Sequence, residues 1–423
     1  MSGPAEAVVR RRLSQEELNA VCMRHDRLWQ ARPGGARAVF AWMDISGLSL
    51  RGKNLADADF SAAAMIGCDL TGARLDNATF FGADMQDAIL VDASLKRADL
   101  RGACLRGADL SGADLFEADL REGTIAASDP LLGFRVIEAT ARSETQAQGA
   151  CLAGANLQRS KLTGIVAVQA DFTDAVMKDC KLVRANLKQA TFRGADLAGA
   201  DLSGADFSGA DMRDAVLVGC KTTQWRADGA NMDGALTDDR PTGAAVSRMP
   251  AAEMLHEHAV WCETGGTDGA PSVFDGVDLR ALRSIKGFNL TALSARGAVF
   301  YGLDMEGVKL QGAHLEKADL RAANLRGADL RGARLNGARL SGADMREVQL
   351  GPLMISADRL LPADLTGASL RGVDLSGSDL RRAVMAGTDL SRATLHGALM
   401  RQTDLTGADL NGVRGLPTLE ARQ

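Results

Sequence analysis

The chain has 423 residues, with 46 glycines, an aromatic content of 4% and a formal net charge of -5. Its apolar content of 46% is ordinary for a folded protein and excludes the intrinsically disordered class. No run of about 18 apolar residues occurs, so we expect no membrane span. The N-terminal residues lack the apolar core of a signal peptide. Seven cysteines without a C-x-x-C pair indicate reduced thiols, which predicts a cytoplasmic protein.

The first predicted element is a helix over residues 14–31, SQEELNAVCMRHDRLWQA. Ser14 and Glu17 have the spacing of a capping box, in which each side chain accepts a hydrogen bond from the other residue's backbone N–H. The sequence RPGG that follows ends the helix. One helical face carries the residues that we expect to cap the next element: Leu18, Val21, Cys22, His25 and Trp29.

A large apolar residue then recurs at every fifth position in three blocks, over residues 45–125, 152–217 and 285–410. In the stretch ADLRGACLRGADLSGADLFEADL, an alanine stands two positions before each leucine and a glycine often follows. A period of five matches neither an α-helix nor a single β-strand. In the third block, positions 350–365 are irregular but remain in phase.

A chain wound into square coils explains this pattern. In each five-residue side, the large residue and the small residue two positions earlier point inward, and the other three face solvent. Four sides give twenty residues per coil, so residues twenty apart stack on one another. The predicted interior ladder includes Phe60 and Phe80, Met65 and Met85, Phe172 and Phe192, Leu100 and Leu120, and Leu330.

The repeat resembles that of the pentapeptide-repeat family, whose motif is A-(D/N)-L-x-x. Matching triplets begin at Ala98, Ala108, Ala200 and Ala328. The resemblance covers most of residues 43–236 and 277–413. It implies an all-β solenoid, a right-handed quadrilateral parallel β-helix, which here carries short capping helices.

Residues 250–266, PAAEMLHEHAVWCETGG, repeat the features of the first helix. Met254, His258 and Trp261 share a face, and two glycines end the element. A phenylalanine and the start of a repeat block follow both helices. This pattern indicates an internal duplication, with a boundary near residues 240–250.

The chain therefore divides into an N-terminal cap (1–42), a first β-helix module (43–240), a linker with a second cap (241–276) and a second module (277–423). Residues 126–149 interrupt the first module and shift its register by two residues. We expect a projecting loop or a short helix there. The alternative is a true break between two separate β-helices.

The C-terminal sequence GVRGLPTLEARQ is too short for a full capping helix. Only Leu416 and Leu419 are expected to cover the last coil. An uncovered end of a β-helix can pair with another chain, so a second copy of this protein is a candidate partner.

No catalytic, cofactor-binding or metal-binding residue is predicted. His25 and His258 lie on the apolar faces of the predicted caps, where a packed, hydrogen-bonded role is favoured. His256 and His258 are two residues apart and do not share a helix face. Asp99 and Asp119 are stacked carboxylates at a repeat position that carries aspartate throughout. With no phosphate-binding glycine motif either, an enzyme is the least favoured class and no cofactor is expected.

Charge is distributed unevenly along the repeat. Acidic residues exceed basic residues by five over 45–125 and by one over 150–240, whereas basic residues are in excess by three over 275–415. The third block carries an arginine stripe: Arg321, Arg326, Arg331, Arg334, Arg339 and Arg346. Aspartates are interspersed among these arginines, so a solvated mixed-charge surface is favoured and direct nucleic-acid binding is not expected.

Some pentapeptide-repeat proteins bind DNA gyrase as mimics of duplex DNA, and only the first block has the acidic balance that this requires. We therefore favour a non-enzymatic, rigid scaffold or protein-binding module of a bacterial cytoplasm. A DNA-mimicking inhibitor or protector of gyrase or another type II topoisomerase is the alternative. The predicted binding surfaces are residues 126–149 and 236–275, where the repeat is broken.

Overall fold

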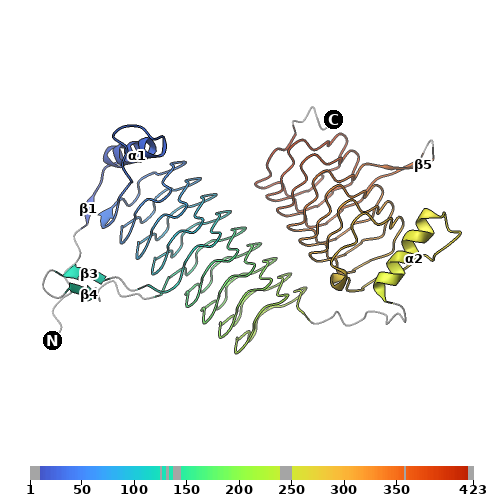
Figure 1. Ribbon diagram of the computed structural model, residues 1–423, viewed down its shortest axis with the longest axis horizontal. Coiled ribbons are helices and arrows are strands. Elements are labelled where there is room, and N and C mark those ends of the chain that lie inside the picture. The colour runs from blue at the N-terminus through green and yellow to red at the C-terminus, as the bar shows by residue number, and fades with distance from the viewer. Residues whose placement is uncertain are drawn as a thin grey trace. The chain divides into compact units, whose positions relative to one another are not determined.

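The computed structural model describes residues 10–123, 126–129, 133–136, 144–238, 250–356 and 359–417. The chain divides into two compact units, Met1–Asp238 and Asp239–Gln423, each described by itself. Within each unit the chain winds through stacked coils that advance along one axis (Figure 1). Most of the boundary predicted near 240–250 lies outside the described residues.

Parallel β-bridges join residues twenty apart in successive coils. Asp59 pairs with Thr79, and Thr79 pairs in turn with Asp99. Backbone hydrogen bonds flank each bridge: the Leu100 N–H donates to the Asp119 carbonyl at 2.8 Å, and the Asp119 N–H donates to the Ala98 carbonyl at 3.0 Å. Each coil therefore has four five-residue sides and bonds to the coils before and after it.

The five residues of a side have fixed roles. Leu100 is fully buried and Ala98 almost so, while Asp99 between them points outward at the bridge. The second residue after the leucine, Gly102, has a φ of 65°. Glycine adopts this left-handed conformation at no steric cost, which explains why it recurs at this corner.

Like residues stack in the interior. The rings of Phe40, Phe60 and Phe80 have successive centroid distances of 5.0 and 4.8 Å, and Phe172 lies 4.8 Å from Phe192. The other ladder residues are also fully buried: Met65, Met85, Leu100, Leu120 and Leu330. Each unit has its own apolar core of this kind.

The helix α1, Gln15–Trp29, covers the start of the first unit (Figure 1). The Glu17 N–H donates to the Ser14 hydroxyl and the Ser14 N–H donates to the Glu17 carboxylate, which confirms the capping box. Leu18 and Cys22 are buried against the core of the first coils. Before the helix, β1 (Arg11–Arg12) pairs in parallel with β2 (Met43–Asp44).

Trp29 departs from the position expected for it. We expected it on the buried face of the cap, but its side chain is 44% exposed. Its ring lies under the Arg74 guanidinium, 5.3 Å from the ring centroid, and its indole nitrogen is 3.1 Å from Nε2 of His25. The tryptophan stands at the last residue of α1, where the helix has already passed the edge of the coil.

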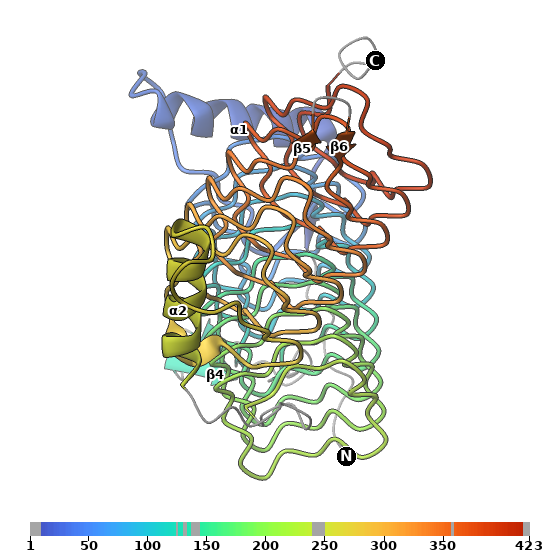
Figure 2. The ribbon, with the colours of Figure 1, turned by 90° about the vertical axis from the view of Figure 1, so that its right-hand side faces the viewer.

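The helix α2, Ala251–Glu263, lies beside the first coils of the second unit (Figures 1 and 2). Leu255, His258 and Ala259 are its buried residues. Met254 and Trp261 are half-buried. Met254 packs against the core and the Trp261 ring lies 5.7 Å from the His258 ring, in agreement with the face that we expected these residues to share. No helix in the described part of the chain is long and apolar enough to cross a bilayer.

The first interruption contains an antiparallel hairpin of β3 (Ala126–Asp129) and β4 (Gly133–Val136). A projecting insertion is therefore correct, but these described residues form a hairpin where we expected a loop or a short helix (Figure 1). Cys104 pairs with Gln146, 42 residues later, instead of with a residue twenty positions later. The interruption therefore adds 22 residues, which is one coil and two residues. The insertion therefore sits within one continuous β-helix, and the alternative of two separate β-helices is wrong. The rest of 126–143 lies outside the described residues.

A second hairpin was not expected. Strands β5 (Leu353–Ser356) and β6 (Arg359–Leu361) pair antiparallel and project from the second unit (Figure 1). Arg334 pairs with Asp364, ten residues beyond the usual twenty-residue spacing, so ten residues are inserted. Ten residues equal two sides of the coil, which is why the repeat stays in phase.

Two smaller features complete the second unit. The short 3-10 helix η2, Arg280–Leu282, adds one residue to the first coil, since Asp278 pairs with Val299. At the other end, the half-buried Leu416 packs against the core, whereas Leu419 lies outside the described residues.

Candidate functional site

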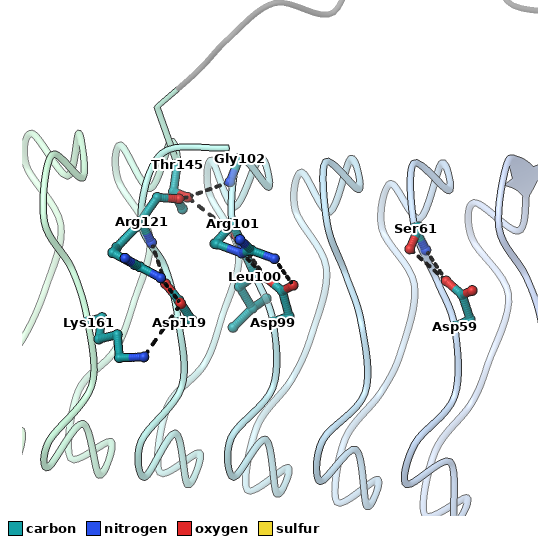
Figure 3. A network of polar contacts seen from close by, with 10 residues as sticks. All are labelled: Asp59, Ser61, Asp99, Leu100, Arg101, Gly102, Asp119, Arg121, Thr145 and Lys161. Atoms are coloured by element: carbon teal, nitrogen blue, oxygen red, sulfur yellow. Dashed lines mark hydrogen bonds and ion pairs between the residues drawn. The ribbon is translucent and has the colours of Figure 1, made fainter. Parts of the chain in front are cut away.

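The outward aspartates close the turns of the coil. Oδ1 of Asp59 accepts hydrogen bonds from the backbone N–H of Ser61 at 3.0 Å and from its hydroxyl at 2.6 Å (Figure 3). Asp109 makes the same pair of contacts with Ser111. Such turns hold a carboxylate oxygen against the backbone two residues later. The recurrent aspartate therefore has a structural use wherever this contact forms.

Where arginine replaces serine, the turn becomes an ion pair. The Arg101 guanidinium donates to both carboxylate oxygens of Asp99, at 2.9 and 2.7 Å, and Arg121 binds Asp119 in the same way (Figure 3). Burial opposes ionisation of Asp119, but the hydrogen bonds from Arg121 hold its pKa below the ordinary value. The stacked carboxylates are thus partners of arginines, and Asp119 is ionised at neutral pH, unsuited to donating a proton.

Thr145 fixes the point where the first interruption returns to the coil. Its hydroxyl is fully buried, accepts a hydrogen bond from the Gly102 N–H at 2.9 Å and donates to the Arg121 carbonyl at 2.8 Å (Figure 3). These bonds satisfy backbone groups of two successive coils, so the returning chain restores the ladder.

The two buried histidines have matching positions in the two caps. Nδ1 of His25 accepts a hydrogen bond from the Ala38 N–H at 3.0 Å, and Nδ1 of His258 accepts one from the Ser272 N–H at 2.9 Å. In both caps the donor lies two residues before a buried phenylalanine of the first coil. Burial lowers the pKa of both imidazoles, so they are held neutral. They tie each helix to its β-helix.

Neither the buried Cys68 thiol nor a cluster of metal-ligand side chains forms a reactive centre in the described residues. Burial raises the pKa of Cys68 to about 11, and its Sγ donates to the Ile45 carbonyl. A thiol held in this state is a poor nucleophile. Among the residues that the structure describes, no three His, Cys, Asp or Glu side chains gather as metal ligands.

Two open clefts of similar size lie on the described surface. One, of about 610 Å³, runs along the first unit between charged residues of both signs, such as Arg97, Glu117, Arg159 and Asp179. The other, of about 640 Å³, lies in the second unit at the base of the β5–β6 hairpin. Only the second carries a strong excess of one charge, and sequence reasoning did not find it.

Comparison with known proteins agrees with this geometry. A family model described as pentapeptide repeats matches more than half of the chain in eight copies. The matched residues are 36–72, 54–92, 93–124, 150–189, 180–219, 313–350, 363–397 and 386–414. The chain belongs to the pentapeptide-repeat family. Members of this family form a right-handed β-helix, the fold that the resemblance implied.

Several solved pentapeptide-repeat structures are similar to the chain. Rfr23 from the cyanobacterium Cyanothece is 25% identical over 33% of this chain and 91% of its own, with a TM-score of 0.25. HetL from Nostoc, involved in heterocyst differentiation regulation, is 21% identical over 93% and 92%, with a TM-score of 0.18. QnrB1, a plasmid-mediated fluoroquinolone resistance protein, is 20% identical over 48% and 93%, with a TM-score of 0.29. The search of curated proteins finds no match.

Proposed function

We propose that this pentapeptide-repeat chain is a non-enzymatic, rigid protein-binding scaffold of a bacterial cytoplasm. The observation that carries the proposal is that polar wall side chains already serve the coil. Asp59 closes a turn, Asp119 pairs with Arg121, and His258 holds a cap. Groups fixed in this way are poorly placed to transfer protons or attack a substrate.

Rigidity is supported by the backbone, because each coil bonds to the coils on either side. In the part of the chain that the structure describes, the two hairpins leave this frame between coils (Figure 1). Loops that project from a rigid frame are common carriers of binding. The partner in this proposal is a protein, and a second copy of the chain is one candidate.

A DNA-mimicking modulator of gyrase remains the second candidate function. The acidic excess over residues 45–125 favours it. The bidentate pairing of Asp99 with Arg101 and of Asp119 with Arg121 opposes it, because paired carboxylates produce a weaker negative field than bare ones.

Two deletions test the scaffold proposal without disturbing the coil. Removal of residues 122–143 and removal of residues 351–360 each restore the twenty-residue pairing on either side of the deletion. We expect the full chain to capture bacterial proteins saturably and at least one deletion to lose a subset of them. If both deletions keep every partner, binding at the interruptions is wrong.

Gyrase supercoiling assays separate the two functions. The scaffold proposal predicts no effect of the purified chain. Inhibition or protection at sub-micromolar concentration, abolished by charge reversals within residues 45–125, would establish the alternative instead.

A further inference from the structure

A cleft of about 640 Å³ lies where the β5–β6 hairpin leaves the second unit, and we name it the arginine cleft. Four arginines line it: Arg331, Arg381, Arg382 and Arg401. Met354 and Leu360 of the hairpin line its apolar side, and Asp379 is its one lining carboxylate. It therefore combines a basic surface with an apolar one.

Stacking of the coils brings these arginines together. Asp329, Gln349, Asp379 and Leu399 pair in succession through parallel bridges. The residues two positions later, 331, 351, 381 and 401, therefore follow one corner of the β-helix. Position 351 is a glycine, which leaves the corner open between two arginines that stand two coils, or about 10 Å, apart.

The neighbour of Gly351 favours a residue without a side chain at this position. A Cβ atom placed there would lie 3.2 Å from Oδ2 of Asp379, a tighter contact than side chains normally make. Asp379 is 9% exposed and accepts two hydrogen bonds from Arg381, at 2.9 and 2.7 Å, which hold its pKa below the ordinary value. The charge of the lining carboxylate is thus balanced by one arginine.

The lining keeps an excess of arginine over carboxylate after these ion pairs. Arg331 pairs through Nε and Nη2 with Asp329, which lies outside the lining, so its charge is also balanced by a carboxylate. Arg382 donates from Nε to the neutral side-chain amide of Gln402 at 2.7 Å. A guanidinium has five N–H groups, so each of these bonds leaves further donors on the same group.

The hairpin supplies an apolar surface that water does not favour. Met354 is 69% exposed and Leu360 is 41% exposed, although both are large apolar residues. The base of the hairpin is held in place, because Leu353 and Leu361 pack closely over Gly332, which follows Arg331 in the same corner of the preceding coil. The described β5 and β6 form a sheet of two strands, which leaves an outer edge on each for a further strand.

We propose that the arginine cleft binds an extended acidic segment of a partner protein that also carries apolar side chains. Carboxylates of the segment would meet the guanidinium groups, which bind carboxylates in pairs of hydrogen bonds. Its apolar side chains would cover Met354 and Leu360, and its backbone would pair with a hairpin edge. The proposal names the partner chemistry of the scaffold function and rests on that function.

A protein segment fits better than a nucleic acid. A phosphate backbone would gain from the arginines but not from the exposed methionine and leucine, and would approach the carboxylate of Asp379. The hairpin edge also offers hydrogen bonds that match a peptide backbone.

The test uses the full chain and a fluorescein-labelled nonapeptide of alternating glutamate and valine, measured by fluorescence anisotropy. We expect saturable binding that weakens as salt rises. The same peptide with glutamine in place of glutamate should bind at least tenfold more weakly. Absence of saturable binding by the acidic peptide up to millimolar protein overturns the proposal.

Matched variants locate the site. Arg382→Gln with Arg401→Gln should weaken peptide binding at least tenfold, whereas Arg326→Gln with Arg346→Gln, exposed on another side of the coil, should not. Met354→Ser should weaken binding several-fold, while Ile355→Ser, its neighbour outside the cleft, should leave it unchanged. Equal effects of each pair contradict the proposed site.

A competition experiment decides between ligand classes. If duplex DNA displaces the peptide and its own binding depends on Arg382 and Arg401 but not on Met354, the ligand is a nucleic acid and the proposal is wrong. If the peptide does not bind but deletion of residues 351–360 still removes captured partners, the scaffold function stands and only the acidic-segment proposal fails.

Discussion

The two hairpins leave their coils in different ways. The first interruption is longer than a full coil, and its return is fixed by hydrogen bonds of the buried Thr145. The second is half a coil long and is fixed by packing of Leu353 and Leu361 over Gly332. The β-helix continues through both. A coil of this kind tolerates a departure at a corner when the returning chain can pair again with its neighbours.

The largest expected effect comes from breaking the interior that both hairpins leave intact. Leu110 is fully buried in the ladder. Leu110→Arg would bury an unpaired charge, so we expect a loss of more than about 4 kcal/mol in the free energy of unfolding, or failure to fold. Urea denaturation followed by circular dichroism measures it, and near-wild-type stability would contradict the inward assignment.

The second expected effect comes from a shift in the five-residue register of the coil. Removal of residues 351–360 keeps the register, whereas removal of 351–359 displaces every following side chain by one position. The coil can pair again only by absorbing this one-residue slip near the deletion, so we expect the nine-residue deletion to destabilise the second unit by several kcal/mol, on the order of the loss of one core residue. Comparable melting temperatures for the two deletions would show that phase does not matter.

Loss of the Thr145 hydroxyl at the end of the first interruption is expected to have a smaller effect on the free energy of unfolding. Thr145→Val keeps the shape of the side chain but removes the hydroxyl that bonds the Gly102 N–H and the Arg121 carbonyl. The Gly102 N–H keeps its bond to the Arg121 carbonyl at 3.1 Å, so we expect a loss of about 1 kcal/mol. Thr366→Val is a control, because Thr366 is exposed, and it should cost less in the same urea titration. If the two substitutions lower the free energy of unfolding equally, the Thr145 hydroxyl does not hold the returning chain in place.

The buried histidine of the second cap is expected to make the free energy of unfolding depend on pH, by about as much as Thr145→Val lowers it or less. Burial lowers the pKa of His258, so its stabilising contribution is complete above the unfolded pKa of about 6.5 and is lost as pH falls below it. The slope is at most about 1.4 kcal/mol per pH unit. Urea titrations at pH 7.5 and 5.5 should show a smaller pH dependence for His258→Gln than for wild type, while exposed His256→Gln keeps the wild-type dependence.

The smallest effect on the free energy of unfolding is expected for the outward-facing aspartates of the coil. Asp109→Asn retains the Oδ1 acceptor that closes the turn onto Ser111. We expect a change within about 0.5 kcal/mol. A loss of stability as large as that of Thr145→Val would mean that the negative charge of Asp109, rather than its hydrogen bonds to Ser111, stabilises the coil.

The coil could be predicted from the sequence because every five-residue side buries residues at the same two positions. Leu100 and Phe60 stand at positions where a large apolar residue is needed in each turn of the chain. The β5–β6 hairpin escaped notice because ten residues equal two sides and leave the period unchanged. The arginine cleft escaped notice for a related reason, since Arg331 and Arg381 fall in the same corner of the β-helix only once that insertion is counted.

The position of binding on this scaffold is the central claim, and site-specific photo-crosslinking tests it most directly. A photoreactive amino acid would replace either Met354 in the arginine cleft or Val176, an exposed apolar residue on an uninterrupted wall. We predict that a bacterial protein, competed by the acidic peptide, is trapped at position 354 and not at 176. Trapping at 176 alone, or equally at both positions, would contradict the account.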